Sequence, residues 1–308
     1  MRILFWGTPQ FAAPPLRALL GEGFDVCGVV TRPDKPVGRE RILTPPPIKL
    51  IALEEELPVF QPPSARDADF ATQIAELRPD LSVVVAYGHI LPRAMIELPV
   101  LGTVNIHGSL LPALRGAAPI QAAVREGLSE TGVSIMRMVP ALDAGPVILQ
   151  ARTPVADDET YGELQVRLSE MGALALIEAL ALMELGRASE RPQDDLLATY
   201  APKVNRDTTR IDWKLAAAQI CNAVRAYDPS PGAWTTLGGA DVKLFGARRL
   251  VDASGQPGEL LSAGEDGMVI ACGTGAALIS EVQPAGKRRM AAIAWQRGRG
   301  IAIGDRLA

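Results

Sequence analysis

The sequence has few of the side chains that bind metal ions or form disulfides. It contains 2 histidines and 3 cysteines in 308 residues. Cys27, Cys221 and Cys272 lie far apart and show none of the spacings of a metal-ligand set, so we expect no metal site. An odd number of scattered cysteines also argues against a disulfide framework and is typical of a reducing cytoplasm.

Several common sequence signals are missing as well. No apolar run reaches the roughly 18 residues that a membrane-spanning helix needs. The first residues, MRILFWGTPQ, have the pattern of a strand rather than of a signal peptide. There is no P-loop, no G-x-S-x-G and no G-x-G-x-x-G after the first strand. These absences predict a cytoplasmic protein with no membrane partner, and we expect a monomer.

Net charge is small but unevenly distributed. The whole chain carries −4, which by itself argues against a nucleic-acid partner. Residues 205–308 hold 13 Lys and Arg against 10 Asp and Glu, giving +3, so the remainder carries −7. This asymmetry points to a polyanionic partner for the C-terminal part, with ordinary variation of surface charge as the alternative.

The first half of the chain alternates between strand-like and helical segments. The strand-like runs are RILFWG, DVCGVVT, PVFQ, LSVVVAY, GTVNIH and GVSIMRMV. They lack strict polar alternation and are separated by helical patterns, which predicts a parallel sheet covered on both faces. The fold class is therefore α/β, with a doubly wound, mostly parallel sheet.

The second half of the chain has a different pattern of apolar residues. A long helix from about Glu159 to Leu185 closes the α/β domain, and the following charged segment loses periodicity. Short strand-like runs separated by glycines then predict a small antiparallel barrel. We therefore expect a first domain over 1–188, a linker over 189–206 and a second domain over 207–308.

A polar pair stands at the end of the run GTVNIH. Asn105 and His107 are two residues apart, so they share one face of the strand at the edge where open parallel sheets bind ligands. Asp143, 36 residues after His107, lies in a glycine-bearing turn near the same edge. Amide, imidazole and carboxylate together suit oxyanion stabilisation and proton transfer. The alternatives are a satisfied polar pair and an ordinary turn aspartate.

The loop GSLLPALRGAAP follows this pair. Its prolines stiffen the backbone and its glycines allow close approach, so Leu110 and Leu111 could clamp a flat, partly apolar ligand. Arg115 is suited to meet a carboxylate or a phosphate.

These motifs together resemble a known family. Asn-x-His followed by SLLP, then RGAAPI, then Leu-Asp-x-Gly is similar to the formyltransferases that use 10-formyltetrahydrofolate. The segments GTPQFAAPPLRAL, TRPDKPVGR, VVVAYGHILP and RIDW also occur in the expected order, so the resemblance covers the whole chain.

The resemblance implies a fold, an activity and a set of site residues. It implies a Rossmann-like first domain, a C-terminal OB-like barrel, and formyl transfer to the α-amino group of methionine on initiator tRNA, as needed for translation initiation. Asn105, His107 and Asp143 match the catalytic residues of the family. The folate-contacting segment corresponds to Ser109, Leu110, Leu111 and Pro112. Expected tRNA contacts are Arg39 and Arg41 in an inserted basic loop, and Lys287, Arg288 and Arg289 near the C-terminus.

Two other functions compete with this one. The first is another formyltransferase or hydrolase that uses the same folate. The second is a non-catalytic tRNA-binding protein, against which the complete Asn105, His107 and Asp143 set counts. In the expected loop, Glu40 and Ile42 depart from the family pattern, so tRNA binding through this loop is either weaker or borne chiefly by Arg39 and Arg41.

Overall fold

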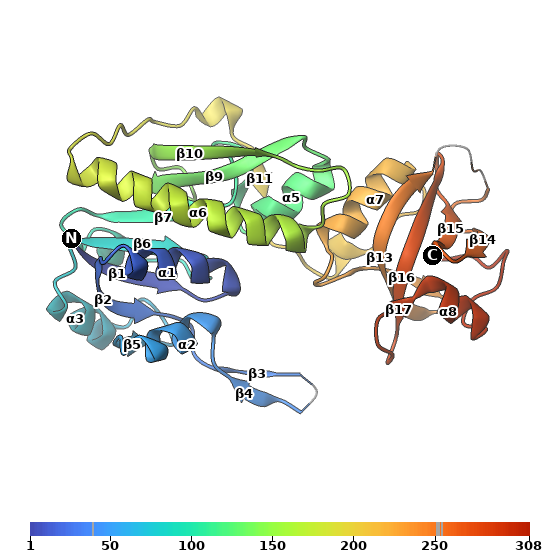
Figure 1. The fold of residues 1–308 in the computed structure, drawn as a ribbon, viewed down its shortest axis with the longest axis horizontal. Helices are drawn as coiled ribbons and strands as arrows, with labels where there is room; N and C mark the ends of the chain where they lie inside the picture. Colours follow the sequence, from blue (N-terminus) through green and yellow to red (C-terminus); the bar gives the residue numbers. More distant parts are fainter. Residues whose placement is uncertain (39, 251–252, 254) are drawn as a thin grey trace. The chain divides into compact units, whose positions relative to one another are not determined.

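The computed structural model describes residues 1–38, 40–250, 253 and 255–308, and the chain divides into two compact units (Figure 1). The N-terminal unit comprises Met1–Pro119, Thr131–Thr153 and Gln165–Tyr200. The C-terminal unit comprises Ile120–Glu130, Pro154–Leu164 and Ala201–Ala308. Because both units draw on several stretches of chain, the domain boundaries at 188 and 206 stay a prediction.

A seven-stranded sheet forms the centre of the N-terminal unit, in the order β10-β9-β7-β6-β1-β2-β5. Its strands are β1 (Arg2–Gly7), β2 (Asp25–Val30), β5 (Val59–Phe60), β6 (Leu81–Val85), β7 (Thr103–His107), β9 (Glu130–Arg137) and β10 (Val147–Pro154). Pairing is parallel from β7 to β5, whereas β9 runs antiparallel to β7. The predicted mostly parallel sheet is confirmed.

Helices separate these strands along the chain. They are α1 (Ala13–Gly21), α2 (Pro47–Glu54), α3 (Ala68–Glu76), α4 (Arg93–Ile96), α5 (Pro119–Glu126) and α6 (Tyr161–Glu184), with a 3₁₀ turn at Gln10–Ala12. The Asp67 side chain accepts a hydrogen bond from the Phe70 amide and so caps the N-terminus of α3. The long helix that sequence periodicity predicted is α6.

Both faces of the sheet are covered. Leu4 and Trp6 of β1 pack with Phe70 of α3 in one core, and Ile3 on the opposite face is also fully buried. On β7, Ile106 lies so close to α6 that a Cβ at Gly172 would come within 3.0 Å of it. Burial on both faces explains why the strands read as continuous apolar runs.

The C-terminal unit is built on an antiparallel sheet in the order β12-β13-β16-β15-β14, with β17 paired to β16. Its elements are α7 (Ala217–Ala226), β12 (Ala233–Leu237), β13 (Ala240–Leu250), β14 (Leu260–Gly264), β15 (Gly267–Ala271), β16 (Ala276–Pro284), β17 (Met290–Ala291) and α8 (Ala292–Arg297). The predicted antiparallel strands are confirmed. The sequence pattern missed β17 and α8, which are short.

The last residues of the chain join the two ends of this sheet. The amide of Leu260, in β14, donates to the Asp305 carbonyl, and the Leu307 amide donates to the Gly258 carbonyl. Thr236 of β12 exchanges a pair of backbone hydrogen bonds with Ala308. Residues 304–308 therefore satisfy edge groups of both β14 and β12, which would otherwise be open sheet edges.

Two small sheets complete the fold. β3 (Lys35–Val37) and β4 (Ile42–Thr44) form an antiparallel hairpin, and β8 (Arg115–Gly116) pairs with β11 (Tyr200–Ala201). The chain also makes 3₁₀ turns at Asp195–Leu197 and Asp207–Thr209. None of the helices within the described ranges has the length and apolar character of a membrane span.

Candidate active site

Asn105 and His107 lie at the carboxyl end of β7. Both are flanked by buried neighbours on a strand in the middle of the sheet, which holds their backbone rigidly. His107 is 5% exposed, whereas Asn105 is half-buried. The alternation predicted from the sequence therefore brings both polar side chains to the ligand-binding edge of the sheet.

The imidazole of His107 has one ring nitrogen bound and one facing a carboxylate. Its Nε2 lies 3.0 Å from the Leu114 carbonyl oxygen. Because a carbonyl only accepts, Nε2 carries the proton and donates, and Nδ1 has the lone pair in the neutral ring. Nδ1 lies 3.8 Å from Oδ2 of Asp143.

Burial is the main influence on the charge of this imidazole. It lowers the pKa of His107 below the usual 6.5, while Asp143 and the Leu114 hydrogen bond act in the opposite direction. The resting side chain is therefore neutral at neutral pH, and the Asp143 carboxylate is placed to stabilise a proton that arrives on Nδ1. His107 therefore does not carry a proton on Nδ1 before substrate binds.

Asp143 lies between β9 and β10 in a left-handed backbone conformation, with φ of 47°. Aspartate tolerates this region better than most residues. The Gly116 amide donates to Asp143 Oδ2 over 2.8 Å, which fixes the carboxylate that faces His107. The structure thus brings the predicted Asp143 within 3.8 Å of His107 across 36 residues of chain.

The Asn105 side chain differs from those of His107 and Asp143 in its hydrogen bonding. Within the described ranges no hydrogen bond is formed by its amide, although the residue is half-buried beside His107. A half-buried amide without a partner is poised to bind a ligand atom. The site therefore offers a free N–H donor next to a histidine–aspartate pair.

The segment Ser109–Pro112 follows His107, and hydrogen bonds with Ser134 and Gln150 hold its backbone in place. Ser134 Oγ donates to the Ser109 carbonyl and accepts from the Leu111 amide, and Gln150 Nε2 donates to the Leu111 carbonyl. Ser109 and Leu111 are buried, whereas Leu110 and Pro112 are half-buried. The two half-buried side chains are therefore the ones that a ligand along this segment can reach, and Leu111 belongs to the core.

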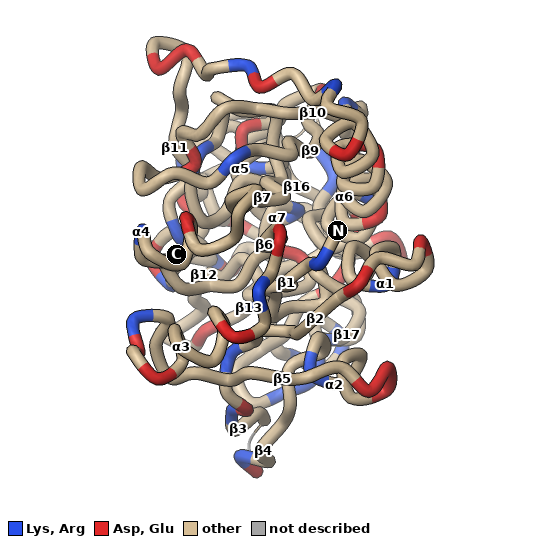
Figure 2. The backbone as a smooth tube through the Cα atoms, turned by 90° about the vertical axis from the view of Figure 1, so that its left-hand side faces the viewer, with Lys and Arg blue, Asp and Glu red and all other residues tan. Residues whose placement is uncertain are grey.

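The predicted basic loop is a hairpin, β3–β4, rather than an irregular connection. Its base is tied by Lys49, whose Nζ contacts both oxygens of Asp34 at 2.8 and 2.9 Å. Arg41 is exposed near the tip, with φ of 51°, and Arg39 lies outside the described residues. Figure 2 marks both basic and acidic positions on this hairpin, consistent with Glu40 beside Arg41.

The three basic residues predicted near the C-terminus differ in availability. Lys287 and Arg288 are exposed in the turn between β16 and β17. Arg289 instead contacts Asp228 at 2.8 Å and Glu281 at 2.5 Å, and its guanidinium lies 4.1 Å from the centre of the Phe245 ring. Arg289 therefore has a structural role within the C-terminal unit that its sequence context did not reveal.

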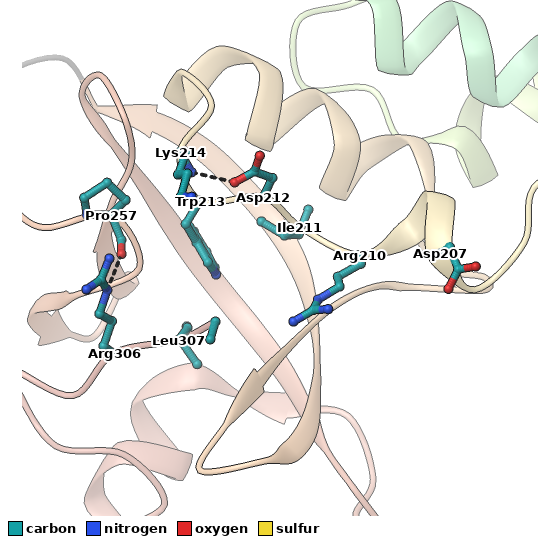
Figure 3. Close-up of a pocket in the computed structure, with 10 residues that line it drawn as sticks. Asp207, Arg210, Ile211, Asp212, Trp213, Lys214, Pro257, Arg306 and Leu307 are labelled. Carbon is teal, nitrogen blue, oxygen red and sulfur yellow. Dashed lines mark hydrogen bonds between the residues drawn. The ribbon is translucent and has the colours of Figure 1, made fainter.

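A cavity of about 660 Å³ lies in the C-terminal unit (Figure 3). Trp213, Arg210, Lys214, Arg306 and the last two residues contribute to its wall. Arg306 donates to the Pro257 carbonyl, and the Lys214 amide donates to Asp212. None of the predicted site residues that the structure describes lines it. Among the described residues, no group of three or more His, Cys, Asp or Glu could hold a metal ion.

Sequence reasoning missed the residues that support the site. Arg115, predicted to meet a ligand anion, is 3% exposed and contacts Gln193 and Asp195 instead. Gln193 and Thr199 come from the segment predicted as a linker. Loss of periodicity suggests an irregular connection there, and no local signal reveals its contacts, because their partners lie about 50 to 85 residues away.

Comparison with known proteins places the chain in a family. The sequence model of the Formyl transferase family matches residues 1–180, and that of its C-terminal domain matches residues 203–300. Methionyl-tRNA formyltransferase of Pseudomonas putida strain GB-1 is 48% identical over 288 residues, 93% of each chain.

Solved structures show the same fold. Methionyl-tRNA formyltransferase from Clostridium thermocellum superposes with a TM-score of 0.57 at 13% identity, over 82% of this chain and 95% of that one. HypX from Aquifex aeolicus in complex with tetrahydrofolic acid gives a TM-score of 0.66 at 21% identity, over 99% of this chain and 48% of that one. With both family domains matched and nearly half of its residues shared with the Pseudomonas enzyme, the chain belongs to the methionyl-tRNA formyltransferase family.

Proposed function

We propose that this protein transfers a formyl group from 10-formyltetrahydrofolate to the α-amino group of methionyl initiator tRNA. The observation that carries the proposal is the Asn105 amide, which forms no hydrogen bond with any described residue and lies beside the His107–Asp143 pair, in a chain 48% identical to a methionyl-tRNA formyltransferase. The folate supplies the activated formyl group, and the protein supplies orientation, charge stabilisation and proton transfer.

Asn105 stabilises the charge that develops during transfer. Attack of a neutral amine on the formyl carbon moves negative charge onto the formyl oxygen. The Asn105 N–H donor, half-buried and not committed to any described protein group, is available to that oxygen. A preorganised donor of this kind lowers the barrier because it needs no rearrangement when charge appears.

His107 moves the proton. With Nε2 bound to the Leu114 carbonyl, neutral His107 presents the Nδ1 lone pair to the site and takes the proton that the attacking nitrogen must lose. The resulting imidazolium is stabilised by Asp143, 3.8 Å from Nδ1. His107 then returns the proton to the folate nitrogen as its bond to the formyl carbon breaks, so the proton balance closes without a covalent enzyme intermediate.

The folate fits along Ser109–Pro112. Leu110 and Pro112 present apolar surface, and the Ser134 and Gln150 hydrogen bonds hold the backbone between them in one conformation. A rigid, partly apolar edge suits a flat heterocycle, because little conformational entropy is lost on binding.

The tRNA contacts are divided between the two units. Arg41 on the hairpin and Lys287 and Arg288 in the β16–β17 turn are exposed cations suited to phosphate. Arg39 stays a proposed tRNA contact on the strength of the sequence alone. We place the catalytic domain at 1–188, the linker at 189–206 and the tRNA-binding domain at 207–308. The three buried free cysteines favour a reducing cytoplasm, where the protein acts as a monomer.

One assay tests the function and its competitors. Tetrahydrofolate release is measured with methionyl initiator tRNA, with an amino-sugar nucleotide, and without acceptor. We expect release to depend on methionyl-tRNA and to be lost in His107→Ala. Release without acceptor would indicate a hydrolase, release with the sugar nucleotide alone another formyltransferase, and tRNA binding without release a non-catalytic protein.

A further inference from the structure

The segment of residues 190–200, here called the strap, lies along the active site of the N-terminal unit. It is fastened at both ends. Glu190 contacts Arg137 at 2.7 Å, Arg191 and Val147 exchange backbone hydrogen bonds, and Tyr200 begins β11, which pairs with β8. Its side chains are mostly exposed, but Gln193 is half-buried and turned toward the loop that carries Asp143.

Every hydrogen-bonding position of the Gln193 amide is used. Its Nε2 donates to the Asp143 carbonyl over 2.8 Å and to the Gly145 carbonyl over 2.7 Å. Its Oε1 accepts from Arg115 Nε and Nη2, at 3.0 and 2.8 Å. Since a guanidinium only donates and carbonyls only accept, the orientation of the amide is unambiguous. No other side chain of this length can satisfy both sets of partners.

Arg115 holds the other side of Gln193. It is 3% exposed, and its Nη2 also contacts the Asp195 carboxylate of the strap at 2.8 Å. A buried guanidinium without partners is strongly unfavourable, so the burial of Arg115 favours its contacts with Gln193 and Asp195 of the strap. The chain of contacts therefore runs from Arg115 through Gln193 to the backbone of Asp143.

A second strap residue, Thr199, binds Leu114, whose carbonyl is the hydrogen-bond partner of His107. Thr199 Oγ1 accepts from the Leu114 amide over 2.8 Å, and the Thr199 carbonyl accepts from the Arg115 amide over 2.8 Å. Leu114 has a φ of 60°, which is unfavourable for leucine, and its carbonyl is the one that binds His107 Nε2. The strap thus holds in place both the carbonyl behind His107 and the loop that bears Asp143.

We propose that the strap positions the His107–Asp143 pair and that Gln193 is its positioning residue, acting through the backbone of Asp143. This rests on the proposed function, because it assigns Gln193 a role in that same site. Gln193 does not touch substrate. Its removal lets the Asp143 loop drift and leaves substrate contacts in place.

Two variants of nearly the same size separate packing from hydrogen bonding. Gln193→Met keeps the volume and removes both donors. Gln193→Glu keeps the contact with Arg115 and turns an oxygen toward two carbonyls. Glu190→Ala is the matched control, since it breaks another strap contact, with Arg137, that does not involve Asp143.

Steady-state kinetics and amide exchange are measured on the full chain. A displacement on the order of 1 Å at a catalytic group costs about 100-fold, so we expect kcat to fall by about 10- to 100-fold in both variants. Both KM values should stay within about twofold, because ground-state binding is untouched. The Gly116 amide donates to Asp143. Its hydrogen exchange should be faster than in the wild type in both Gln193 variants and should be the same as in the wild type in Glu190→Ala.

Two results overturn the inference: wild-type kcat in Gln193→Met, or a fall in kcat without faster exchange at Gly116. Failure of the proposed function looks different, since the wild-type chain would then not formylate methionyl-tRNA at all. In that case the exchange at Gly116 still decides whether Gln193 holds the Asp143 loop.

Discussion

Asp143→Asn isolates the charge of Asp143 from its shape. Asparagine tolerates the left-handed backbone at φ of 47°, and its side-chain oxygen can still accept from the Gly116 amide. The hydrogen bonds from Gln193 reach backbone carbonyls and are unaffected. The substitution therefore removes one negative charge 3.8 Å from His107 Nδ1 and little else.

The expected size of the effect follows from that distance. Unit charges about 3.8 Å apart attract by about 4 kcal/mol at an effective dielectric constant of about 20. The Asp143 side chain is 19% exposed, so solvent screens part of this attraction. With about 1.4 kcal/mol for each tenfold change in rate, we expect the transfer rate to fall by about 10²- to 10³-fold.

Single-turnover formylation of methionyl-tRNA at saturating folate measures this step directly. Because the carboxylate raises the pKa of His107, its removal should also move any His107-dependent limb of the pH profile to lower pH. Thermal unfolding serves as the control for an intact fold. A variant that retains more than about a tenth of the wild-type rate would refute the electrostatic role assigned to Asp143.

Further predictions concern the neighbouring residues. Asn105→Ala should lower kcat by about 10²- to 10³-fold with nearly normal folate binding, measured by fluorescence titration; weaker binding with normal kcat would contradict this. Burial lowers the pKa of His107, so the unfolded chain takes up this proton first. Stability relative to His107→Asn should therefore fall as pH decreases from about 6.5 toward the lower folded pKa, as urea unfolding can show; parallel curves would exclude it. Leu110→Ala should raise the KM for folate more than that for tRNA, and the reverse order would misplace the folate. The pair Lys287→Ala and Arg288→Ala should flatten the salt dependence of tRNA binding, by a slope of about 1 for each phosphate that the protein no longer neutralises, and an unchanged slope would remove this turn from the interface.

Local patterns in the sequence were sufficient for most of the framework. The buried run Leu81–Val85 and the N-cap at Asp67 are readable because each depends on neighbouring residues only. The polar pair Asn105 and His107 was predictable for the same reason, because side chains two residues apart on a strand point to the same face of the sheet.

Features with a weak local signal or with distant partners were not predictable. The hairpin β3–β4 has a proline in its first strand, which weakens the strand signal. The antiparallel direction of β9 depends on the path of the preceding loop. Arg289 is held by Asp228, 61 residues away, whereas Lys287 in the same turn is exposed. For Arg289 the sequence shows a suitable basic residue, but its partner depends on the tertiary fold.

The strap has a consequence for how such proteins can recombine. It falls in residues 181–202, between the stretches that match the two family sequence models. Because neither family model matches this interval, sequence similarity alone would allow the first half of one relative to be joined here to the second half of another. By its contacts it is inherited with the first half, because Gln193 and Thr199 must meet a matching Arg115 and Leu114. A chimera joined after Tyr200 keeps these pairs together, whereas one joined at 185 exchanges half of each pair and leaves a buried arginine facing an unselected segment.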